Sequence, residues 1–383
     1  MHILIAIDSF KGCLSSMEVA AAVAAGIKKA APQLTVTPVP VADGGEGTVE
    51  AVLFATGGRQ VFTRVTGPLR KPVAAFYGLL PDGTAVIEMA AAAGLGLVPP
   101  DQRQPAQATT YGVGELIKQA LAKGCRRFII GLGGSATNDA GIGMLTALGW
   151  RFLDKNGRPV DPVGATLRQI ARIDEENVLP ELAKCRFTVI NDVSNPLTGP
   201  EGATHTFAAQ KGADPVTIAQ LEEGMRHFAG LVASHTGSDK APLPGSGAAG
   251  GLGFALAAFL QAQLQPAAEV LFPLLKMQEK MQAADLVITG EGRLDSQTAN
   301  GKLAWQIARL ARQYHKPAIA LAGEITPEAY DLLHPDLDAL FAITNGPLSR
   351  QETMRPAVTR QLLSRQAGEI IRLIQTTGKI IPT

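Results

Sequence analysis

The chain has few cysteines and almost no net charge. Its 383 residues contain three cysteines, and 35 basic side chains balance 34 acidic ones for a net charge of +1. Cys13, Cys125 and Cys185 lie far apart and form no C-x-x-C pair, which favours a reducing cytoplasm over a disulfide framework. Without a basic surplus the sequence argues against nucleic acid as a partner.

Long apolar runs and a leader segment are also missing. The longest apolar stretch, residues 247–260, is shorter than the roughly 18 residues that a membrane span needs. The amino terminus reaches Asp8 too soon for a signal peptide. We therefore predict a cytoplasmic protein with small-molecule partners and no membrane partner, and the sequence leaves a homodimer open.

Several catalytic motifs are absent as well. There is no G-x-x-x-x-G-K-[ST] phosphate loop, no G-x-S-x-G nucleophile elbow, and no metal-binding spacing among the six histidines. Residues 245–250 fit G-x-G-x-x-G, but residues 241–244 contain two prolines and cannot form the strand that a dinucleotide fingerprint requires. This context argues against a nicotinamide-dependent dehydrogenase.

Glycine is abundant, with 41 residues, and its excess lies in four turns, at residues 41–48, 131–139, 244–253 and 289–298. Three of these turns mix glycine with carboxylates. They are typical of loops at the carboxyl ends of strands, where open α/β sheets bind ligands. For residues 244–253, a tightly packed helix entry and a phosphate loop are equally good interpretations.

The second turn follows a predicted buried strand and is expected to lead into a helix that runs through Leu148. Backbone N–H groups of its glycines could converge on an anion, because glycine has no Cβ to block the approach. The polar residues that follow could cap the helix, hold a metal or contact a ligand. They are Ser135, Thr137, Asn138 and Asp139.

The order of strands and helices predicts an α/β fold. Strands at residues 3–7 and 36–41 flank a helix whose Ser15 and Glu18 have the spacing of a capping box. Three tightly connected strands follow, with a hairpin signal at 81–83, and strand–helix alternation returns at residue 286. Residues 154–176 and 200–214 resemble polar loops.

This pattern predicts two α/β domains with the active-site cleft between them. Residues 1–58 and 280–383 would form a Rossmann-like, doubly wound parallel sheet, and residues 59–279 an inserted mixed α/β domain.

The loop carboxylates and lysines are an inventory suited to phosphoryl transfer. Carboxylates can hold Mg²⁺, lysines and amides can neutralise phosphates, and one carboxylate can position the attacking hydroxyl. Each carboxylate taken alone is better explained as a helix cap or a surface charge, so the interpretation depends on the set. The set is Asp8, Lys11, Asp43, Glu46, Asp139, Asp192, Glu291, Asp295 and Lys302.

Nine segments, in this order along the chain, resemble the type I family of bacterial glycerate kinases. They lie at residues 8–11, 40–48, 65–68, 87–90, 131–139, 192–197, 210–213, 244–253 and 288–297. The sequence departs from the family in having Ile7 before Asp8, Gly12 after Lys11, and Ala93. The Gly12 difference removes a carboxylate that the family usually has, and the tail after about residue 350 matches weakly.

The resemblance implies two α/β domains, one of them inserted, and ATP- and Mg²⁺-dependent phosphorylation of D-glycerate. The implied product is 2-phosphoglycerate, in the breakdown of glyoxylate, glucarate or galactarate. A glycerate 3-kinase, a kinase of another small hydroxy acid, and a non-catalytic metabolite sensor are the alternatives.

Individual roles are hypotheses. Asp192 is the candidate for aligning the substrate hydroxyl, with an Asx-turn as its alternative. Arg293 is the candidate for the glycerate carboxylate, with a salt bridge to Glu291 or Asp295 as its alternative. Lys11 would offset phosphate charge.

The remaining candidate residues are grouped by expected role as catalytic, metal-binding, substrate-binding and phosphate-binding. Asp43 is a candidate for both catalysis and metal binding. Asp139 and Glu291 are candidates for metal binding only. The other substrate-binding candidates are Asp8, Ser9, Glu46, Asn195 and Asp295. The ATP- or phosphate-binding candidates are Gly133, Gly134, Ser135, Asn138, Gly245, Ser246, Gly247 and Lys302.

Overall fold

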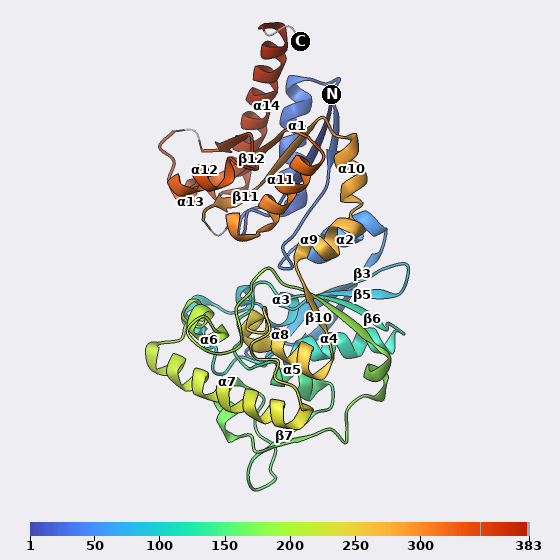
Figure 1. Ribbon diagram of the computed structural model, residues 1–383, viewed down its shortest axis with the longest axis vertical. Coiled ribbons are helices and arrows are strands. Elements are labelled where there is room, and N and C mark those ends of the chain that lie inside the picture. Colours follow the sequence, from blue (N-terminus) through green and yellow to red (C-terminus); the bar gives the residue numbers. More distant parts are fainter. Residues whose placement is uncertain (297, 345, 381–383) are drawn as a thin grey trace. The chain divides into compact units, whose positions relative to one another are not determined.

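A computed structural model describes residues 1–296, 298–344 and 346–380 and contains two compact units (Figure 1). The first unit is Met1–Asp43 with Ala267–Thr383, and the second is Gly44–Pro266. The units divide after residues 43 and 266, whereas the sequence predicts domain boundaries after residues 58 and 279. Among the described residues, no helix is both long enough and apolar enough to cross a membrane.

The first unit is built on a five-stranded sheet in which all neighbouring strands are parallel. In spatial order the strands are β13 (Ala339–Ala342), β12 (Ala318–Ile325), β11 (Leu286–Leu294), β1 (His2–Ile7) and β2 (Thr35–Pro38). The chain winds from β1 to β2 in one direction and from β11 to β13 in the other. The sheet is therefore doubly wound, as predicted, and its topological switch point lies between β1 and β11.

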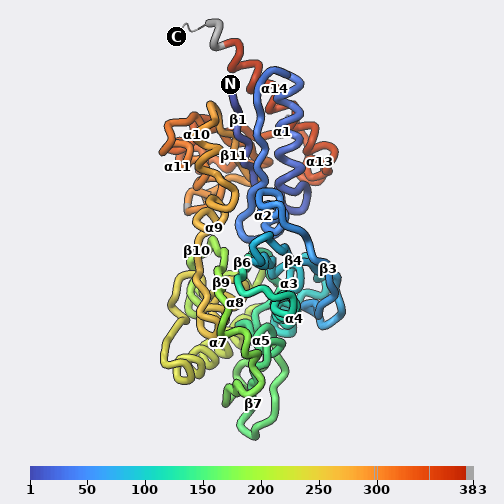
Figure 2. The backbone as a smooth tube through the Cα atoms, turned by 90° about the vertical axis from the view of Figure 1, so that its right-hand side faces the viewer, coloured from blue at the N-terminus to red at the C-terminus, as the bar shows by residue number. Residues whose placement is uncertain are grey.

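Helices cover both faces of this sheet. Helix α1 (Ser16–Ala30) packs against α14 (Pro356–Ile380) and β1, and α11 (Leu303–Gln313) packs against β11 and β12. Figure 2 shows α1 and α14 on one side of β1 and β11, with α10 (Met277–Ala283) and α11 on the other. The remaining helices of the unit are α9 (Ala267–Leu274), η6 (Thr298–Asn300), α12 (Pro327–Leu333) and α13 (Arg350–Thr353).

Helix α1 forms as its sequence predicts. Ser15 and Glu18 make the reciprocal hydrogen bonds of a capping box, and Val19, Val23 and Ile27 are fully buried on one face. Gly26 permits the contact with α14, because a Cβ at this position would lie 2.0 Å from the carbonyl oxygen of Ser364.

The second unit is built on a six-stranded mixed sheet. In spatial order its strands are β10 (Gln263–Gln265), β9 (Arg186–Ile190), β6 (Arg127–Gly131), β5 (Thr84–Glu88), β4 (Pro72–Leu79) and β3 (Arg59–Thr66). The strands from β10 to β5 are parallel, and β3, β4 and β5 pair antiparallel. The predicted turn at 81–83 connects β4 and β5, and Gly83 there has φ +82°. This is the mixed α/β domain that the sequence predicted.

Helices and a small hairpin surround this sheet. The α-helices are α2 (Thr48–Thr56), α3 (Ala90–Ala93), α4 (Tyr111–Ala122), α5 (Ile142–Ala147), α6 (Ala203–Phe207), α7 (Pro215–Thr236) and α8 (Ala248–Phe259). The 3₁₀ helices are η1 (Leu95–Leu97), η2 (Pro100–Gln102), η3 (Gly164–Gln169), η4 (Pro180–Lys184) and η5 (Ala209–Lys211). Strands β7 (Arg151–Leu153) and β8 (Arg172–Asp174) pair antiparallel.

Three local predictions were wrong. The helix expected directly after the turn at 131–134 begins only at Ile142, because Ala140 and Gly141 have positive φ angles of 50° and 73°. The stretches predicted as polar loops contain η3 and β8, and α6 and η5. The fourth glycine-rich turn is largely a continuation of β11, which runs through Leu294.

The longest helix of the second unit was not predicted, although its ends carry signals. Asp214 caps α7 by accepting a hydrogen bond from the Thr217 amide, Pro215 occupies the first turn, and Gly237 ends the helix in the left-handed region. Its buried face includes Leu221, and the helix packs against η3.

Candidate active site

Charged side chains gather at the switch point of the first unit. Asp8 directly follows β1, and Glu291 lies in β11 one residue beyond Gly290, the register partner of Ile7. The Asp8 amide donates to the Gly290 carbonyl oxygen at 2.9 Å. The fold therefore places both carboxylates at the carboxyl edge of neighbouring parallel strands, where doubly wound sheets bind ligands.

Two lysines and further acidic groups complete this cluster. Lys11 Nζ donates to Asp43 Oδ2 at 2.6 Å, and Lys302 Nζ lies 3.4 Å from both Glu291 Oε2 and Asp295 Oδ1. The hydroxyl of Thr298, which is fully buried, donates to Glu291 Oε1 at 2.9 Å. We call Asp8, Lys11, Asp43, Glu291 and Lys302 the switch-point cluster.

The negative charge of this cluster is poorly solvated. Burial, and then the nearby Asp43 carboxylate, raise the pKa of Asp8 to about 8, although Lys11 and the Ser9 amide oppose the shift. Burial also raises the pKa of Glu291, against the pull of Lys302. For Lys11, whose side chain is only partly covered, this partial burial lowers the pKa, but the charge and the hydrogen bond of Asp43 outweigh it and the pKa is raised.

A cluster with this charge pattern suits a hydrated cation. Mg²⁺ is commonly held through one or two carboxylates, with waters and substrate phosphates completing its coordination. In the described part of the chain, no group of three His, Cys, Asp or Glu side chains is arranged to hold a metal by itself. The Asp43 carboxylate is close enough to raise the pKa of Asp8, and a divalent cation would relieve that repulsion.

Arg293 and Ser9 lie at the edge of this cluster. The half-exposed Arg293 guanidinium has its Nε 3.8 Å from both Asp295 Oδ2 and Glu324 Oε1, so the salt bridge considered for it with Asp295 is present. The Ser9 amide donates to Asp8 Oδ1 at 2.7 Å. The structure thus brings predicted residues from two segments together. Asp8, Ser9 and Lys11 follow β1, and Glu291, Arg293 and Asp295 lie in or directly after β11.

The second unit has its own carboxyl edge of parallel strands. Glu88, Gly131 and Ile190 end β5, β6 and β9 in mutual register. The loop after Gly131 and the half-buried Asp192, two residues beyond Ile190, consequently emerge at the same edge. This edge therefore holds the second group of predicted residues.

The glycine-rich loop after β6 combines close packing with unused amides. A Cβ at Gly131 would lie 2.1 Å from the Gly44 carbonyl oxygen, and the Gly133 amide already donates to that oxygen at 3.1 Å. The amides of Gly134 and Ser135, by contrast, make no hydrogen bond to the described part of the chain. The anion role predicted for this loop therefore fits Gly134 and Ser135 better than Gly133.

Asp139 is completely buried and its oxygens are engaged. Its Oδ2 accepts from the amide and hydroxyl of Thr110, both at 2.8 Å, and from the Gly143 amide at 3.3 Å, while Oδ1 accepts from the Gly141 amide at 3.1 Å. Burial nevertheless raises its pKa. This geometry favours the capping role over the metal role predicted for Asp139.

Asn138 is buried beside Asp139. Its Nδ2 donates to Thr204 Oγ1 at 3.1 Å, and its Oδ1 has no hydrogen-bond partner among the described residues.

The glycine-rich entry to α8 is packed against neighbouring backbone. Gly245 has φ +85°, and a Cβ at Gly247 would lie 2.2 Å from the Pro196 carbonyl oxygen. The Ser246 hydroxyl donates to the Ala241 carbonyl oxygen at 2.7 Å, and the Gly247 amide to that of Asn195 at 3.0 Å. These buried contacts favour the packing interpretation of the segment over the phosphate-loop interpretation.

Two predicted substrate-binding residues of this unit differ in their surroundings. Asn195 Nδ2 donates to the Glu201 carbonyl oxygen at 2.7 Å, so this amide helps to shape the loop. Glu46 is exposed, in the turn that leads into α2.

Glu88 and Lys211 are among the buried ionisable residues that the sequence reasoning missed. Glu88, 4% exposed, accepts a hydrogen bond at 2.7 Å from the Val49 amide at the start of α2. Lys211, 2% exposed, donates to Ser135 Oγ and to the Thr137 carbonyl oxygen, both at 2.7 Å. Both lie within segments that resemble the family, which was the available signal. Their burial could not be inferred from local sequence.

Glu88 predicts a specific pH dependence of stability. Burial raises its pKa to about 7, against the hydrogen bond from Val49. The folded carboxyl keeps a proton that the unfolded one has lost, so stability falls as pH rises from about 4.5 to 7. We expect Glu88→Gln to lack this loss and to gain about 2–3 kcal/mol relative to the parent between pH 5 and 8.

Thermal unfolding at pH 5 and pH 8 measures this gain. Glu201→Gln, at an exposed position of the same unit, is the matched control and should follow the parent protein. If the unfolding midpoints of Glu88→Gln and of the parent change equally between pH 5 and pH 8, Glu88 is ionised throughout this range.

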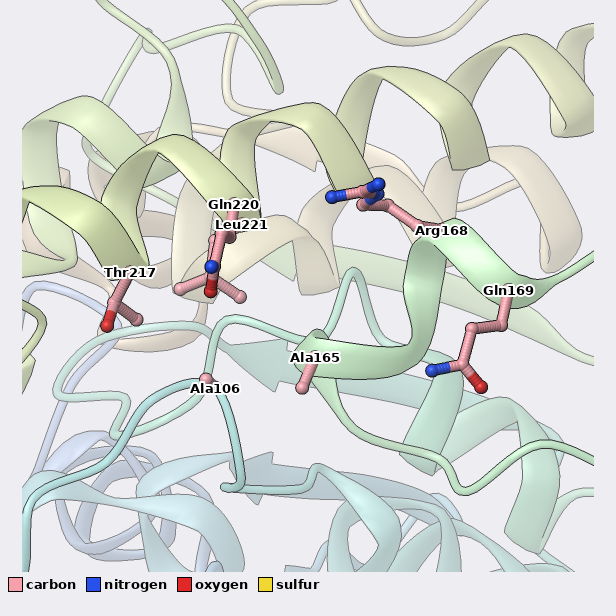
Figure 3. A pocket seen from close by; sticks show the side chains of 7 residues that line it. All are labelled: Ala106, Ala165, Arg168, Gln169, Thr217, Gln220 and Leu221. Atoms are coloured by element: carbon pink, nitrogen blue, oxygen red, sulfur yellow. The ribbon is translucent and has the colours of Figure 1, made fainter.

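Hollows on the second unit do not coincide with these charged groups. One hollow has a volume of about 320 Å³. Figure 3 shows its lining, with Thr217, Gln220 and Leu221 on α7 and Arg168 and Gln169 on η3. The Arg168 guanidinium is paired with Glu223 at 3.0 Å.

A second hollow, of about 830 Å³, includes Arg127, Arg186 and Gln263, which begin β6, β9 and β10, at the opposite edge from the glycine-rich loop. We assign the candidate site from its chemistry, because size alone does not distinguish a reaction site.

Comparisons with known proteins match nearly the whole chain. The family model described as the glycerate kinase family matches residues 3–375. The glycerate kinase of Bacillus subtilis (strain 168) is 45% identical over 376 residues, covering 98% of each chain. The glycerate 2-kinase of Escherichia coli (strain K12) is 44% identical over 358 residues, covering 93% of this chain and 94% of the relative.

A solved structure extends this similarity to three dimensions. The crystal structure described as a glycerate kinase 2 from Salmonella typhimurium LT2 aligns with a TM-score of 0.84 at 43% identity, covering 99% of each chain.

Proposed function

The chain belongs to the glycerate kinase family, and from this premise we propose that it phosphorylates D-glycerate at the 2-hydroxyl, with ATP as donor and Mg²⁺ as cofactor. The family is one of kinases, so the chain is an enzyme. The E. coli relative that is named a 2-kinase supports 2-phosphoglycerate as the product. A role in glyoxylate, glucarate or galactarate catabolism is part of the same proposal.

The switch-point cluster is the observation that best supports phosphoryl transfer. It combines three carboxylates with two lysines at the strand edge where doubly wound sheets bind ligands. Phosphoryl transfer depends on positioning and on charge stabilisation rather than on covalent chemistry by the protein. A sensor for a small acid would need fewer of these charges.

The residues of this cluster suggest a division of labour. Asp43, Asp8 and Glu291 would hold Mg²⁺, which when bound would offset phosphate charge. Lys11 is exposed over most of its side chain and pairs with Asp43, so it can turn toward a phosphate while remaining beside the carboxylates. Lys302 keeps Glu291 in place from the start of α11.

Asp192 and Arg293 are our candidates for contacts with glycerate. Asp192, at the carboxyl edge of β9, would accept the proton of the attacking hydroxyl. Arg293 would bind the substrate carboxylate through its planar guanidinium, exchanging its long contacts with Asp295 and Glu324 for a forked pair of hydrogen bonds.

A coupled assay with D-glycerate, ATP and Mg²⁺ tests the reaction. ADP release whose product enolase converts directly to phosphoenolpyruvate is expected and would establish 2-phosphorylation. A requirement for a mutase before enolase would identify the 3-phosphate instead. If D-glycerate gives no ADP release but another hydroxy acid does, that other acid is the substrate.

The role of Arg293 gives a second prediction. Arg293→Lys keeps the charge but loses the fork, so we expect the KM for D-glycerate to rise about tenfold or more while the KM for ATP stays within twofold. Steady-state kinetics in both substrates measure the split. Arg312→Lys, at an exposed position near the end of α11, is the control. An unchanged KM for glycerate would place the carboxylate site elsewhere.

A further inference from the structure

Lys211 is a lysine side chain buried inside the second unit. It ends η5 with 2% of its surface exposed, and within the described chain its Nζ donates hydrogen bonds to Ser135 Oγ and to the Thr137 carbonyl oxygen, each at 2.7 Å. It makes no ion pair with a carboxylate of the described chain. Burying a charge without a counter-ion is unfavourable, so the arrangement calls for a compensating anion.

The surroundings of Lys211 supply little of that compensation. Burial lowers its pKa to about 7, and Asp139 counteracts this only in part. The Asp139 oxygens are directed to Thr110 and to the amides of Gly141 and Gly143. The neighbouring Arg103, which donates to the Gln210 carbonyl oxygen at 3.5 Å, adds positive charge to the same region.

Ser135 connects this buried charge to the exposed glycine loop. Its hydroxyl oxygen accepts from Lys211, so the hydroxyl hydrogen is available to another acceptor and is made a stronger donor by the cation. The loop is fixed on both sides, since Leu95 donates to the Gly134 carbonyl oxygen at 2.8 Å and the Ala136 amide donates to Ala93 at 2.9 Å.

The amides between these fixed points remain unused. Neither Gly134 nor Ser135 donates its N–H to any part of the chain that the structure describes. Gly134 is exposed and has φ +77°, a conformation in which successive amides form an anion-binding concavity. Gly134 and Ser135 thus offer two amides and one hydroxyl, and this hydroxyl is hydrogen-bonded to Lys211.

We propose that Lys211 is a positioning residue for the phosphate chain of the nucleotide: it orients the Ser135 hydroxyl, which binds a phosphate oxygen together with the amides of Gly134 and Ser135. The inference deepens the proposed kinase function and depends on it for the identity of the anion. A phosphate at this loop supplies the counter-charge that Lys211 lacks, and Lys211 becomes fully protonated when the phosphate binds.

Titration calorimetry of the intact protein with MgADP, and separately with D-glycerate, tests this assignment. Binding of MgADP near pH 7.5, measured in buffers of different ionisation enthalpy, should take up a fraction of a proton. We expect Lys211→Met to weaken MgADP binding about 10- to 100-fold, to abolish the proton uptake, and to leave the Kd for D-glycerate within twofold. Ser135→Ala should weaken MgADP binding in the same direction.

Lys118→Met, at an exposed position on α4, controls for loss of charge. A folded Lys211→Met variant that binds MgADP like the parent would overturn the proposal, and one that loses D-glycerate binding instead would assign the anion as the acid's carboxylate. If Lys211→Met fails to fold, two other measurements test the proposal. They are the proton uptake of the parent on MgADP binding and the affinity of Ser135→Ala for MgADP. A parent protein that binds MgADP with proton uptake but does not phosphorylate glycerate would refute the proposed substrate and leave this inference standing.

Discussion

Replacing Asp192 by asparagine is expected to lower kcat by about 100-fold or more while leaving the fold intact. The side chain stands two residues beyond β9, at the edge where β5, β6 and β9 end together. Asparagine keeps the size and the hydrogen-bonding geometry but cannot accept the proton of the attacking hydroxyl. Removal of a general base typically costs 10²–10⁴ in rate.

The comparison needs a binding measurement and a neutral control. Titration with D-glycerate should give a Kd near that of the parent, because the loss concerns proton transfer rather than binding. Asp101→Asn, at an exposed position of the same unit, should retain full kcat. If Asp192→Asn turns over at close to the parental rate, the carboxylate only shapes its loop, and the base must be sought among other residues.

Replacing Lys11 by methionine is expected to lower kcat/KM by about 10²–10³, the range seen when one preorganised charge-stabilising donor is removed. Lys11 is bonded to Asp43 at 2.6 Å and also opposes the raised pKa of Asp8. Its loss would leave both carboxylates with less compensation and would remove positive charge that stabilises the transferred phosphoryl group.

Two further substitutions separate charge from shape at this position. Lys11→Arg retains the charge and should recover part of the activity, since a guanidinium can still pair with Asp43 but places its charge differently. Lys29→Met, at an exposed position near the end of α1, removes a lysine charge outside the switch-point cluster and should leave the activity unchanged. Equal activities of Lys11→Met and Lys29→Met would exclude Lys11 from the reaction.

Local sequence signals were reliable where one segment determines its own structure. The capping box at Ser15 forms because both partners lie within one turn of helix, and the hairpin at Gly83 forms because glycine admits the required backbone angle. The same reasoning failed after Gly134, where packing of Ala140 and Gly141 against the entry to α8 delays the helix until Ile142. That contact joins segments about a hundred residues apart.

Site predictions divide in the same way. Asp8 and Glu291 could be placed at strand ends from sequence, but only the sheet order makes those strands neighbours. Gly133 and Gly247 lie in segments with the composition of phosphate loops. Their amides, however, donate hydrogen bonds to the carbonyl oxygens of Gly44 and Asn195, which no local pattern indicates. The roles proposed for individual residues stay predictions that the variants above test.

The sequence by itself determined the family, the doubly wound sheet and the mixed second unit, because these follow from segments whose order and composition are specific. Tertiary structure alone decided which ionisable groups are buried. Lys211 and Glu88 look like ordinary surface charges in the sequence. In the structure each is buried by segments distant in sequence, which donate or accept its hydrogen bonds and exclude solvent. Solvation depends on everything that surrounds a side chain, and so it is fixed only when the whole fold is assembled.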